Sequence, residues 1–216
     1  MNAKLACFTS GLALAAVATW TCVDAAPTSS AQAGERIAHA GADGAPPCIS
    51  CHGAHGEGNA AGGFPRLAGL GAAYLQRQLS AFSSGERKNA VMEPIAKALK
   101  ADGAQAVSAY FASLPAPASR HALALDGSAA AALVHEGRWS EARLPACVQC
   151  HGPDVAGVGS DFPPLEGQPA AYIAAQLRAW REGTRPPGPQ GLMQAVAMKL
   201  EAPDIDAVSQ YLGGAD

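Results

Sequence analysis

Two copies of one short motif hold the residues of this chain whose types and spacing can do chemistry. Each copy places two cysteines three positions apart and a histidine directly after them, as Cys48, Cys51 and His52 and as Cys147, Cys150 and His151. Two thiols on one helical turn can reach the two vinyl groups of one porphyrin, and C-x-x-C-H is the attachment signature of c-type haem. The histidine then lies beneath the iron as its proximal ligand. The sequence therefore predicts two covalently bound haem c groups.

A C-x-x-C pair has two other common uses, a redox-active dithiol and half of a zinc site. A redox dithiol has no use for the histidine that follows. The chain has six cysteines, and the remaining two, Cys7 and Cys22, fall in the N-terminal segment. The mature chain then has no spare cysteine for a disulfide, and haem attachment is the favoured interpretation.

The N-terminal segment has the pattern of an export signal. Lys4 is its only early charge, and an uncharged stretch follows from Leu5 to Val23. Small residues suited to cleavage come next at 23–25, with 31–33 as a second option. We expect residues 1–25 to be a cleaved signal peptide and the mature protein to be periplasmic. An uncleaved anchor is the alternative, although Thr, Ser, Gly and Cys interrupt the roughly 20 apolar residues that a membrane helix needs.

The elements that position the two motifs form an internal repeat, seen when the chain is compared with itself at an offset of 96 to 101 residues. AAYLQRQL (72–79) matches AAYIAAQL (170–177), and AVSAYF (106–111) matches AVSQYL (207–212). Apolar residues recur in both copies at helical spacing, and the alternation typical of strands is absent. We expect an all-α fold with domains at 26–114 and 123–216, joined by a Pro/Ala linker at 115–122.

The repeat also indicates the ligand on the other side of each iron, which Met or His can supply. Aligning MEPIAKAL (92–99) with MQAVAMKL (193–200) pairs Met92 with Met193, whereas Met198 falls opposite a lysine. We therefore predict Met92 and Met193 as ligands and assign Met198 to helix packing. The competing ligands are His39, His55, His121 and His135. His39 and His135 are repeat-equivalent, but both precede the haem motif on the opening helix of their repeat.

These residues together resemble the dihaem cytochrome c4 family, two fused class I cytochrome c domains. The resemblance rests on C-x-x-C-H, a proline-containing turn, a Y-x-x-x-Q-L helix and a methionine in each repeat, and it covers residues 33 to 213. It implies a pseudo-twofold arrangement in which the haems face each other through hydrogen-bonded propionates. One departure is the longer stretch TRPPGPQ (184–190) before Met193, which we expect to alter the loop that presents this methionine.

The resemblance also implies roles for residues around each haem. The carbonyls of Pro65 and Pro163 are expected to accept a hydrogen bond from the Nδ1–H of the proximal histidines. Arg87 and Arg185 match an arginine that pairs with haem propionates, with a solvated surface arginine as the alternative. Tyr74 and Tyr172 open the same helix in both repeats, where a place at the propionate edge and a core role are equally open.

Iron with histidine and methionine ligands has no vacancy for a small molecule, so the predicted function is one-electron transfer and not catalysis. By resemblance, the donor is a quinol–cytochrome c reductase or a dehydrogenase, and the acceptor is a terminal oxidase. Membrane association would then be loose and occur through these partners. One alternative is a dihaem subunit of a periplasmic dehydrogenase complex such as a flavocytochrome sulfide dehydrogenase. A dihaem enzyme, such as a peroxidase or a thiosulfate dehydrogenase, and a haem-based gas sensor are less favoured.

The charge balance supports protein partners and not nucleic acid. The formal net charge is −3, which gives no basic surface for a phosphate backbone. Residues 26–118 carry a net charge of +1 and residues 119–216 a net charge of −4. Such a dipole is expected to orient the two ends toward different partners.

Overall fold

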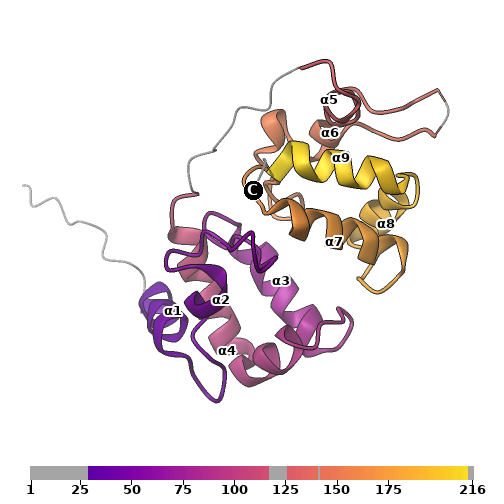
Figure 1. Cartoon of the computed structure of the whole chain (residues 1–216). Helices are drawn as coiled ribbons and strands as arrows, with labels where there is room; N and C mark the ends of the chain where they lie inside the picture. The colour runs from indigo at the N-terminus through magenta and orange to yellow at the C-terminus, as the bar shows by residue number, and fades with distance from the viewer. Residues whose placement is uncertain (1–28, 117–125, 141, 214–216) are drawn as a thin grey trace, which may run out of the picture.

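The computed structural model describes residues 29–116, 126–140 and 142–213. Within these ranges all regular secondary structure is helical, apart from isolated β-bridges, and the helices fall into two groups (Figure 1). The predicted all-α class is confirmed. The expected signal peptide at 1–25 and most of the expected linker lie outside the described residues. No helix in the described ranges is long and apolar enough to cross a membrane.

The first group places the longest helix against two others. Its members are α1 (Ser29–Ala40), α2 (Ile49–His52), α3 (Ala72–Ser83) and α4 (Met92–Ser113). Helix α4 packs against both α1 and α3, and buried Leu75, Leu99, Val107 and Phe111 lie in the core between them.

Two local features shape this group. Gly34 lets α1 cross α4 closely, because a Cβ atom there would lie 2.0 Å from the carbonyl oxygen of Ala106. Lys100 interrupts α4 with a φ of 55°, so α4 is two shorter helices joined at a kink. The first of these shorter helices begins at Met92.

The second group repeats this arrangement with shorter pieces. Its members are α5 (Ala129–His135), α6 (Cys147–His151), η1 (Pro153–Val155), α7 (Ala170–Arg181), η2 (Pro189–Gly191), α8 (Leu192–Ala197) and α9 (Ala202–Gly213). Helix α9 packs against α5 and α7, as α4 packs against α1 and α3, and buried Ile173, Ile205 and Val208 lie in the core. The kink within α4 has become a break between α8 and α9.

The two groups meet along α3 and α7 (Figure 1). Arg87 of the first group donates a hydrogen bond to the Tyr172 hydroxyl at 3.0 Å, and Arg185 of the second donates to the Tyr74 hydroxyl at 3.3 Å. Each contact is the repeat equivalent of the other. Reciprocal pairing of this kind is what a twofold relation produces, and it fits the predicted pseudo-twofold arrangement.

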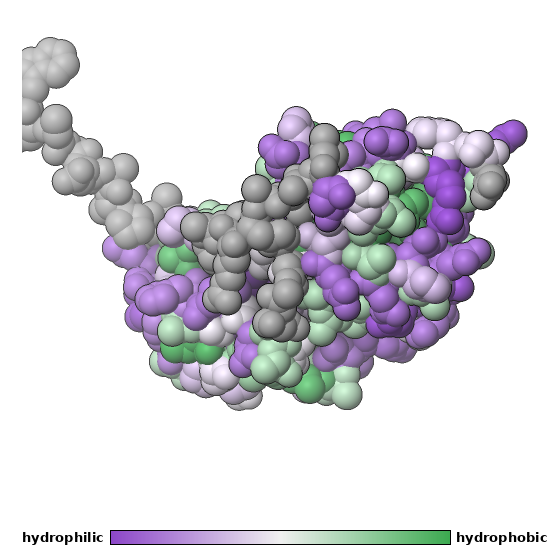
Figure 2. Space-filling view, turned by 45° about the horizontal axis from the view of Figure 1, so that its top comes forward, coloured by the Kyte–Doolittle hydropathy of each residue, from purple (hydrophilic) through white to green (hydrophobic). Residues whose placement is uncertain are grey.

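The surface carries a few exposed apolar side chains among polar ones. Figure 2 shows hydrophilic residues over most of one face, with smaller apolar areas between them. Met198 is 66% exposed at the C-terminal end of α8. Its assignment to helix packing is therefore wrong: Met198 is the residue directly after α8, and its side chain is exposed while that of the preceding Ala197 is buried in the core.

Candidate haem sites

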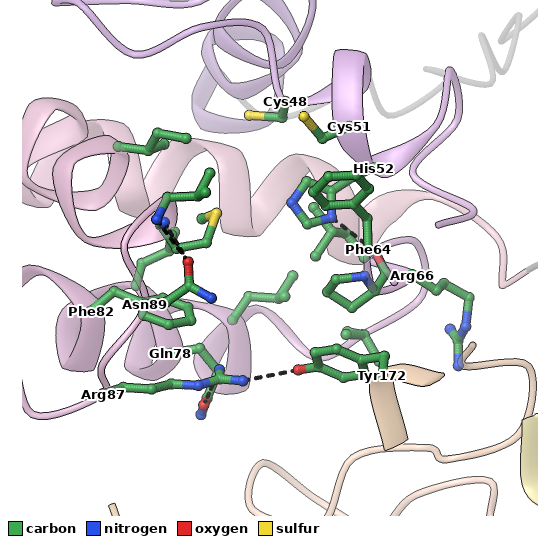
Figure 3. Close-up of a pocket in the computed structure, with 18 of the residues that line it drawn as sticks. Cys48, Cys51, His52, Phe64, Arg66, Gln78, Phe82, Arg87, Asn89 and Tyr172 are labelled. Carbon is green, nitrogen blue, oxygen red and sulfur yellow. Dashed lines mark hydrogen bonds between the residues drawn. The ribbon is translucent and has the colours of Figure 1, made fainter. Parts of the chain in front are cut away.

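Short helices place the two cysteine–histidine motifs. Helix α2 ends at His52 and α6 ends at His151, and in each case a glycine with positive φ follows, at 88° for Gly53 and 80° for Gly152. Both histidines are buried, whereas the motif cysteines are partly exposed. In Figure 3, Cys48 and Cys51 lie side by side above His52, with both sulfurs at one end of the cavity. One helical turn therefore groups two thiols and an imidazole, as the spacing predicts.

The surroundings of the cysteines argue against the two rival uses of C-x-x-C. Burial raises the pKa of Cys48 and raises the pKa of Cys147 to about 11. A redox-active cysteine instead needs a lowered pKa. The described residues contain no group of three or more His, Cys, Asp and Glu side chains that could hold a metal ion such as zinc.

Both proximal histidines make the hydrogen bond that the family resemblance implies. His52 Nδ1 donates to the carbonyl oxygen of Pro65 at 2.9 Å, and His151 Nδ1 donates to that of Pro163 at 2.7 Å. These predicted contacts are confirmed. Burial lowers the pKa of both histidines, which favours the neutral imidazole.

The remaining ring nitrogen is therefore free to bind iron. His151 Nε2 is buried and has no hydrogen-bond partner among the described residues, a costly state for a polar atom. An iron ligand bond at this nitrogen would remove that cost, so the residues present fit a haem. Such a carbonyl partner also fixes the ring and raises its basicity as a ligand.

Aromatic rings hold both imidazoles from the side. Phe64 meets His52 edge to face with ring centroids 6.1 Å apart, and Phe162 meets His151 in the same way at 6.0 Å. Sequence reasoning gave these phenylalanines no role. The repeated Phe-Pro pair was the available signal, since each phenylalanine directly precedes the proline that accepts the histidine's hydrogen bond.

A cavity of about 470 Å³ adjoins the first motif (Figure 3). Cys48, Cys51, His52 and Met92 all line it, so the structure brings the first predicted ligand set into one space. Most of the other lining side chains are apolar, including Leu70, Leu75, Leu79, Phe82, Ile95 and Val107. An apolar cavity with a histidine and a methionine in its wall has the character of a haem pocket.

The second ligand set lies in the second core. Met193 is partly buried and packs against the same cluster of apolar residues as Cys147 and Trp180. His151 belongs to helix α6, which packs against α5. The equivalent of each first-half ligand is therefore present in the second half.

The two methionines are presented differently. Asn89 Oδ1 accepts hydrogen bonds from the backbone N–H groups of Val91 and Met92, at 3.0 and 2.8 Å, and so satisfies the free end of α4. Before Met193 no side chain caps α8, and positive φ angles occur at Gly188, Gln190 and Gly191. The longer stretch 184–190 thus does form a different loop, as its sequence predicts.

Arg87 and Arg185 are buried at the seam between the groups, with 6% and 7% of their surface exposed. The alternative of solvated surface arginines is therefore wrong. Arg87 stacks 4.4 Å over the Phe82 ring and Arg185 3.8 Å over the Trp180 ring. Arg87 also donates to Gln78 and Gln176, and Arg185 donates to Gln78.

All of these hydrogen-bond partners are neutral side chains. The two guanidinium groups therefore lie at the same seam, and none of these hydrogen bonds goes to a carboxylate. Burial and the nearby charge of Arg87 lower the pKa of Arg185. Anionic groups at this seam would relieve that repulsion, and haem propionates are suitable anions. Tyr74 and Tyr172 accept from these arginines, which places both tyrosines at the seam.

Of the competing histidines, His55 is exposed and His121 lies outside the described residues, while His39 and His135 pair elsewhere. His39 Nε2 lies 3.2 Å from the Tyr110 hydroxyl, and His135 Nε2 lies 3.1 Å from the Tyr211 hydroxyl. Each of these pairs joins the opening helix of its group to the closing one. Their imidazoles are therefore engaged at helix contacts.

Sequence reasoning also missed a buried contact between the groups at Arg66 and Gln168. Arg66 is 2% exposed and Gln168 is 5% exposed, and the Gln168 amide bonds to the backbone of Arg66. The signal was a mismatch in the repeat, because FPRL at 64–67 aligns with FPPL at 162–165.

Two helical domains with this motif and histidine geometry define a c-type cytochrome. The family model for cytochrome c matches residues 31–115 and 141–216, and the chain belongs to that family. The crystal structure of cytochrome c4 from Pseudomonas stutzeri is similar with a TM-score of 0.69 and 33% identity, covering 87% of this chain and 98% of that one. The chain is thus a member of the dihaem cytochrome c4 family, an electron-transfer protein with two covalently bound haem c groups.

Two further comparisons find relatives whose names refer to thiosulfate dehydrogenase. A thiosulfate dehydrogenase electron acceptor of Thiomonas intermedia is 47% identical over 170 residues, 76% of each chain. The structure of thiosulfate dehydrogenase (TsdBA) from Marichromatium purpuratum is similar with a TM-score of 0.79 and 43% identity. The match covers 85% of this chain but only 40% of that longer chain.

Proposed function

We propose that this protein is a periplasmic carrier that accepts electrons singly from a thiosulfate dehydrogenase and delivers them toward a terminal oxidase. The observation that carries the proposal is that His52 and Met92 line one cavity, with His151 and Met193 at the equivalent positions of the second repeat. It is supported by the 47% identity to the Thiomonas intermedia electron acceptor. The thiosulfate chemistry would lie with the partner enzyme, and this chain would not itself be an enzyme.

In the first site, Cys48 and Cys51 would hold the porphyrin while His52 and Met92 bind iron. In the second, the same roles fall to Cys147, Cys150, His151 and Met193. When bound, haem c supplies reversible one-electron chemistry at its iron. Pro65 and Pro163 orient the histidines, and Arg87 and Arg185 would hold the propionates at the seam.

Two closed coordination shells suit electron transfer. A methionine sulfur favours the reduced iron and raises the reduction potential, and burial adds to this effect. The chain binds and orients its cofactors and excludes small ligands. Its domains would span 26–114 and 123–216 around a linker at 115–122, after export through residues 1–25.

Stopped-flow reduction of the oxidised holoprotein tests the partner. We expect rapid growth of the reduced haem bands when thiosulfate and a thiosulfate dehydrogenase are added together, and none with either alone. A quinol–cytochrome c reductase with its quinol provides the competing donor. Faster reduction by the reductase than by the dehydrogenase would contradict the proposed donor and favour the general respiratory carrier.

A further inference from the structure

One peptide bond in the first domain is hydrogen bonded on both sides. The carbonyl oxygen of Pro65 accepts from His52 Nδ1 at 2.9 Å. The N–H of the same peptide group, which belongs to Arg66, donates to Gln168 Oε1 at 3.0 Å. A continuous chain of hydrogen bonds therefore runs from Gln168 in the second domain, through this peptide, to the proximal histidine of the first.

Gln168, at the end of this series of hydrogen bonds, is itself fixed by further contacts. Gln168 Nε2 donates back to the carbonyl oxygen of Arg66 at 2.9 Å, which fixes the orientation of the amide. The Arg66 guanidinium donates to the carbonyl oxygens of Ala68 and Glu166, at 2.6 and 2.9 Å. Because Arg66 and Gln168 are almost fully buried, water does not compete strongly for these bonds.

The second domain lacks the equivalent series of hydrogen bonds. His151 Nδ1 donates to the carbonyl oxygen of Pro163, but the residue that follows is Pro164, which has no N–H to donate. In the repeat alignment Gln168 corresponds to Leu70, which has no polar side-chain atom. The chain of hydrogen bonds exists on one side of the pseudo-twofold only.

We propose that Gln168 is a positioning residue for the haem of the other domain, acting through the Pro65–Arg66 peptide on His52. Hydrogen bonds in series polarise one another, so the bond to Gln168 makes the Pro65 carbonyl a stronger acceptor. A stronger acceptor at Nδ1 raises the electron density that Nε2 gives to iron. The contact between the domains thereby favours oxidised iron in the first site and lowers its reduction potential. The inference rests on the proposed ligand role of His52.

Two variants of Arg66 separate the effect of its backbone N–H from the effect of its side chain. Arg66→Ala and Arg66→Pro both remove the guanidinium, but only Arg66→Pro removes the backbone donor. The second domain shows that a Pro-Pro pair fits at this position, as Pro163 and Pro164. Spectroelectrochemical titration of both holoproteins should give a higher reduction potential for the first-domain haem in Arg66→Pro than in Arg66→Ala. The expected change in electron distribution between the haems is up to about tenfold, equivalent to about 59 mV.

A third variant, Gln168→Leu, should raise the first potential as Arg66→Pro does and leave the second unchanged. The NMR resonance of His52 Nδ1–H in the reduced protein gives an independent readout. It should move upfield in Gln168→Leu and Arg66→Pro as its hydrogen bond weakens, while the His151 resonance stays fixed. A purely structural role of the seam would shift both potentials or neither.

The outcomes separate this inference from the ligand assignment. Equal first potentials in Arg66→Ala and Arg66→Pro, with an unmoved His52 resonance, would overturn the role of Gln168. If His52 were not an iron ligand, its ring protons in the wild-type protein would lack the large ring-current shift of a haem ligand. That result would overturn the proposed site itself.

Discussion

The two halves of the molecule have equivalent predicted ligands but differ in the residues that support those ligands. In the first half, Asn89 caps the helix that begins at Met92, and Gln168 reaches the histidine side from the other domain. In the second half, a loop with three positive φ angles precedes Met193, and Pro164 blocks the corresponding donor. The two halves therefore differ in the contacts around the histidine and the methionine, while the histidine and the methionine themselves are equivalent. We expect two haems of the same type with distinct potentials.

The largest expected effect comes from removing either methionine. Met92→Ala and Met193→Ala should each open one iron, so that carbon monoxide binds to about half of the reduced haem while the wild-type protein binds none. Optical titration with carbon monoxide measures this directly. Binding to all of the haem, or to none of it, would contradict one methionine ligand in each half.

Gly34 offers a second contrast, because its repeat equivalent is Ala130. Gly34→Ala should destabilise the first domain by about 1–3 kcal/mol or more, since the added Cβ meets the backbone of α4. Chemical unfolding of the holoprotein measures the change. Ala130→Gly is the matched control, with an expected cost of about 1 kcal/mol from helix propensity and a further cost from the loss of a buried methyl group. Equal costs would show that the two helix crossings are alike.

The cap at Asn89 should strengthen the hold on Met92. Asn89→Ala is expected to cost about 1 kcal/mol of stability, the usual value for a lost N-cap. Imidazole should then displace Met92 at a concentration several-fold lower, as followed by the loss of the far-red methionine–iron absorption band. In the wild-type protein we expect Met193, which lies on the uncapped helix α8, to be displaced first. Displacement of Met92 first would reverse the comparison.

The smallest expected effect is at the exposed edge of the seam. Arg77 and Asp161 form an ion pair of 2.7 Å between the domains, but both side chains are nearly half exposed. Arg77→Ala should therefore change stability by no more than about 1 kcal/mol and leave both potentials in place. Unfolding at low and high salt checks this. A shift in either potential would mean that surface charge, and not the buried seam, distinguishes the halves.

The sequence was most informative where covalent chemistry dictates spacing. The C-x-x-C-H motifs could be predicted because haem attachment requires fixed residue types at fixed separations. The Pro65 and Pro163 contacts were expected from the resemblance to the cytochrome c4 family, and the all-α class from apolar periodicity. Periodicity also located the helices that pack around each motif. The ligand roles of Met92 and Met193 remain predictions, although both residues lie in the expected places.

The contacts between domains were beyond reach of the sequence. Burial of Arg87 and Arg185 depends on how two separately folded surfaces meet, and no pattern within one repeat encodes that. Met198 was misassigned because the repeat alignment excluded it as a ligand without showing whether its side chain faces the core. The Arg66 mismatch was visible, but its meaning required knowing that Gln168 lies opposite.

The reciprocal crossing of Arg87 to Tyr172 and Arg185 to Tyr74 has an evolutionary consequence. Two separate copies of a single half could make the same crossing as a symmetric dimer, since each copy would offer both members of the pair. Joining the copies in one chain would then raise their effective concentration and remove the need for exact symmetry. Duplicated positions were afterwards free to change on one side only. Arg66 and Pro164 are the kind of difference that a fused gene can hold and a homodimer cannot.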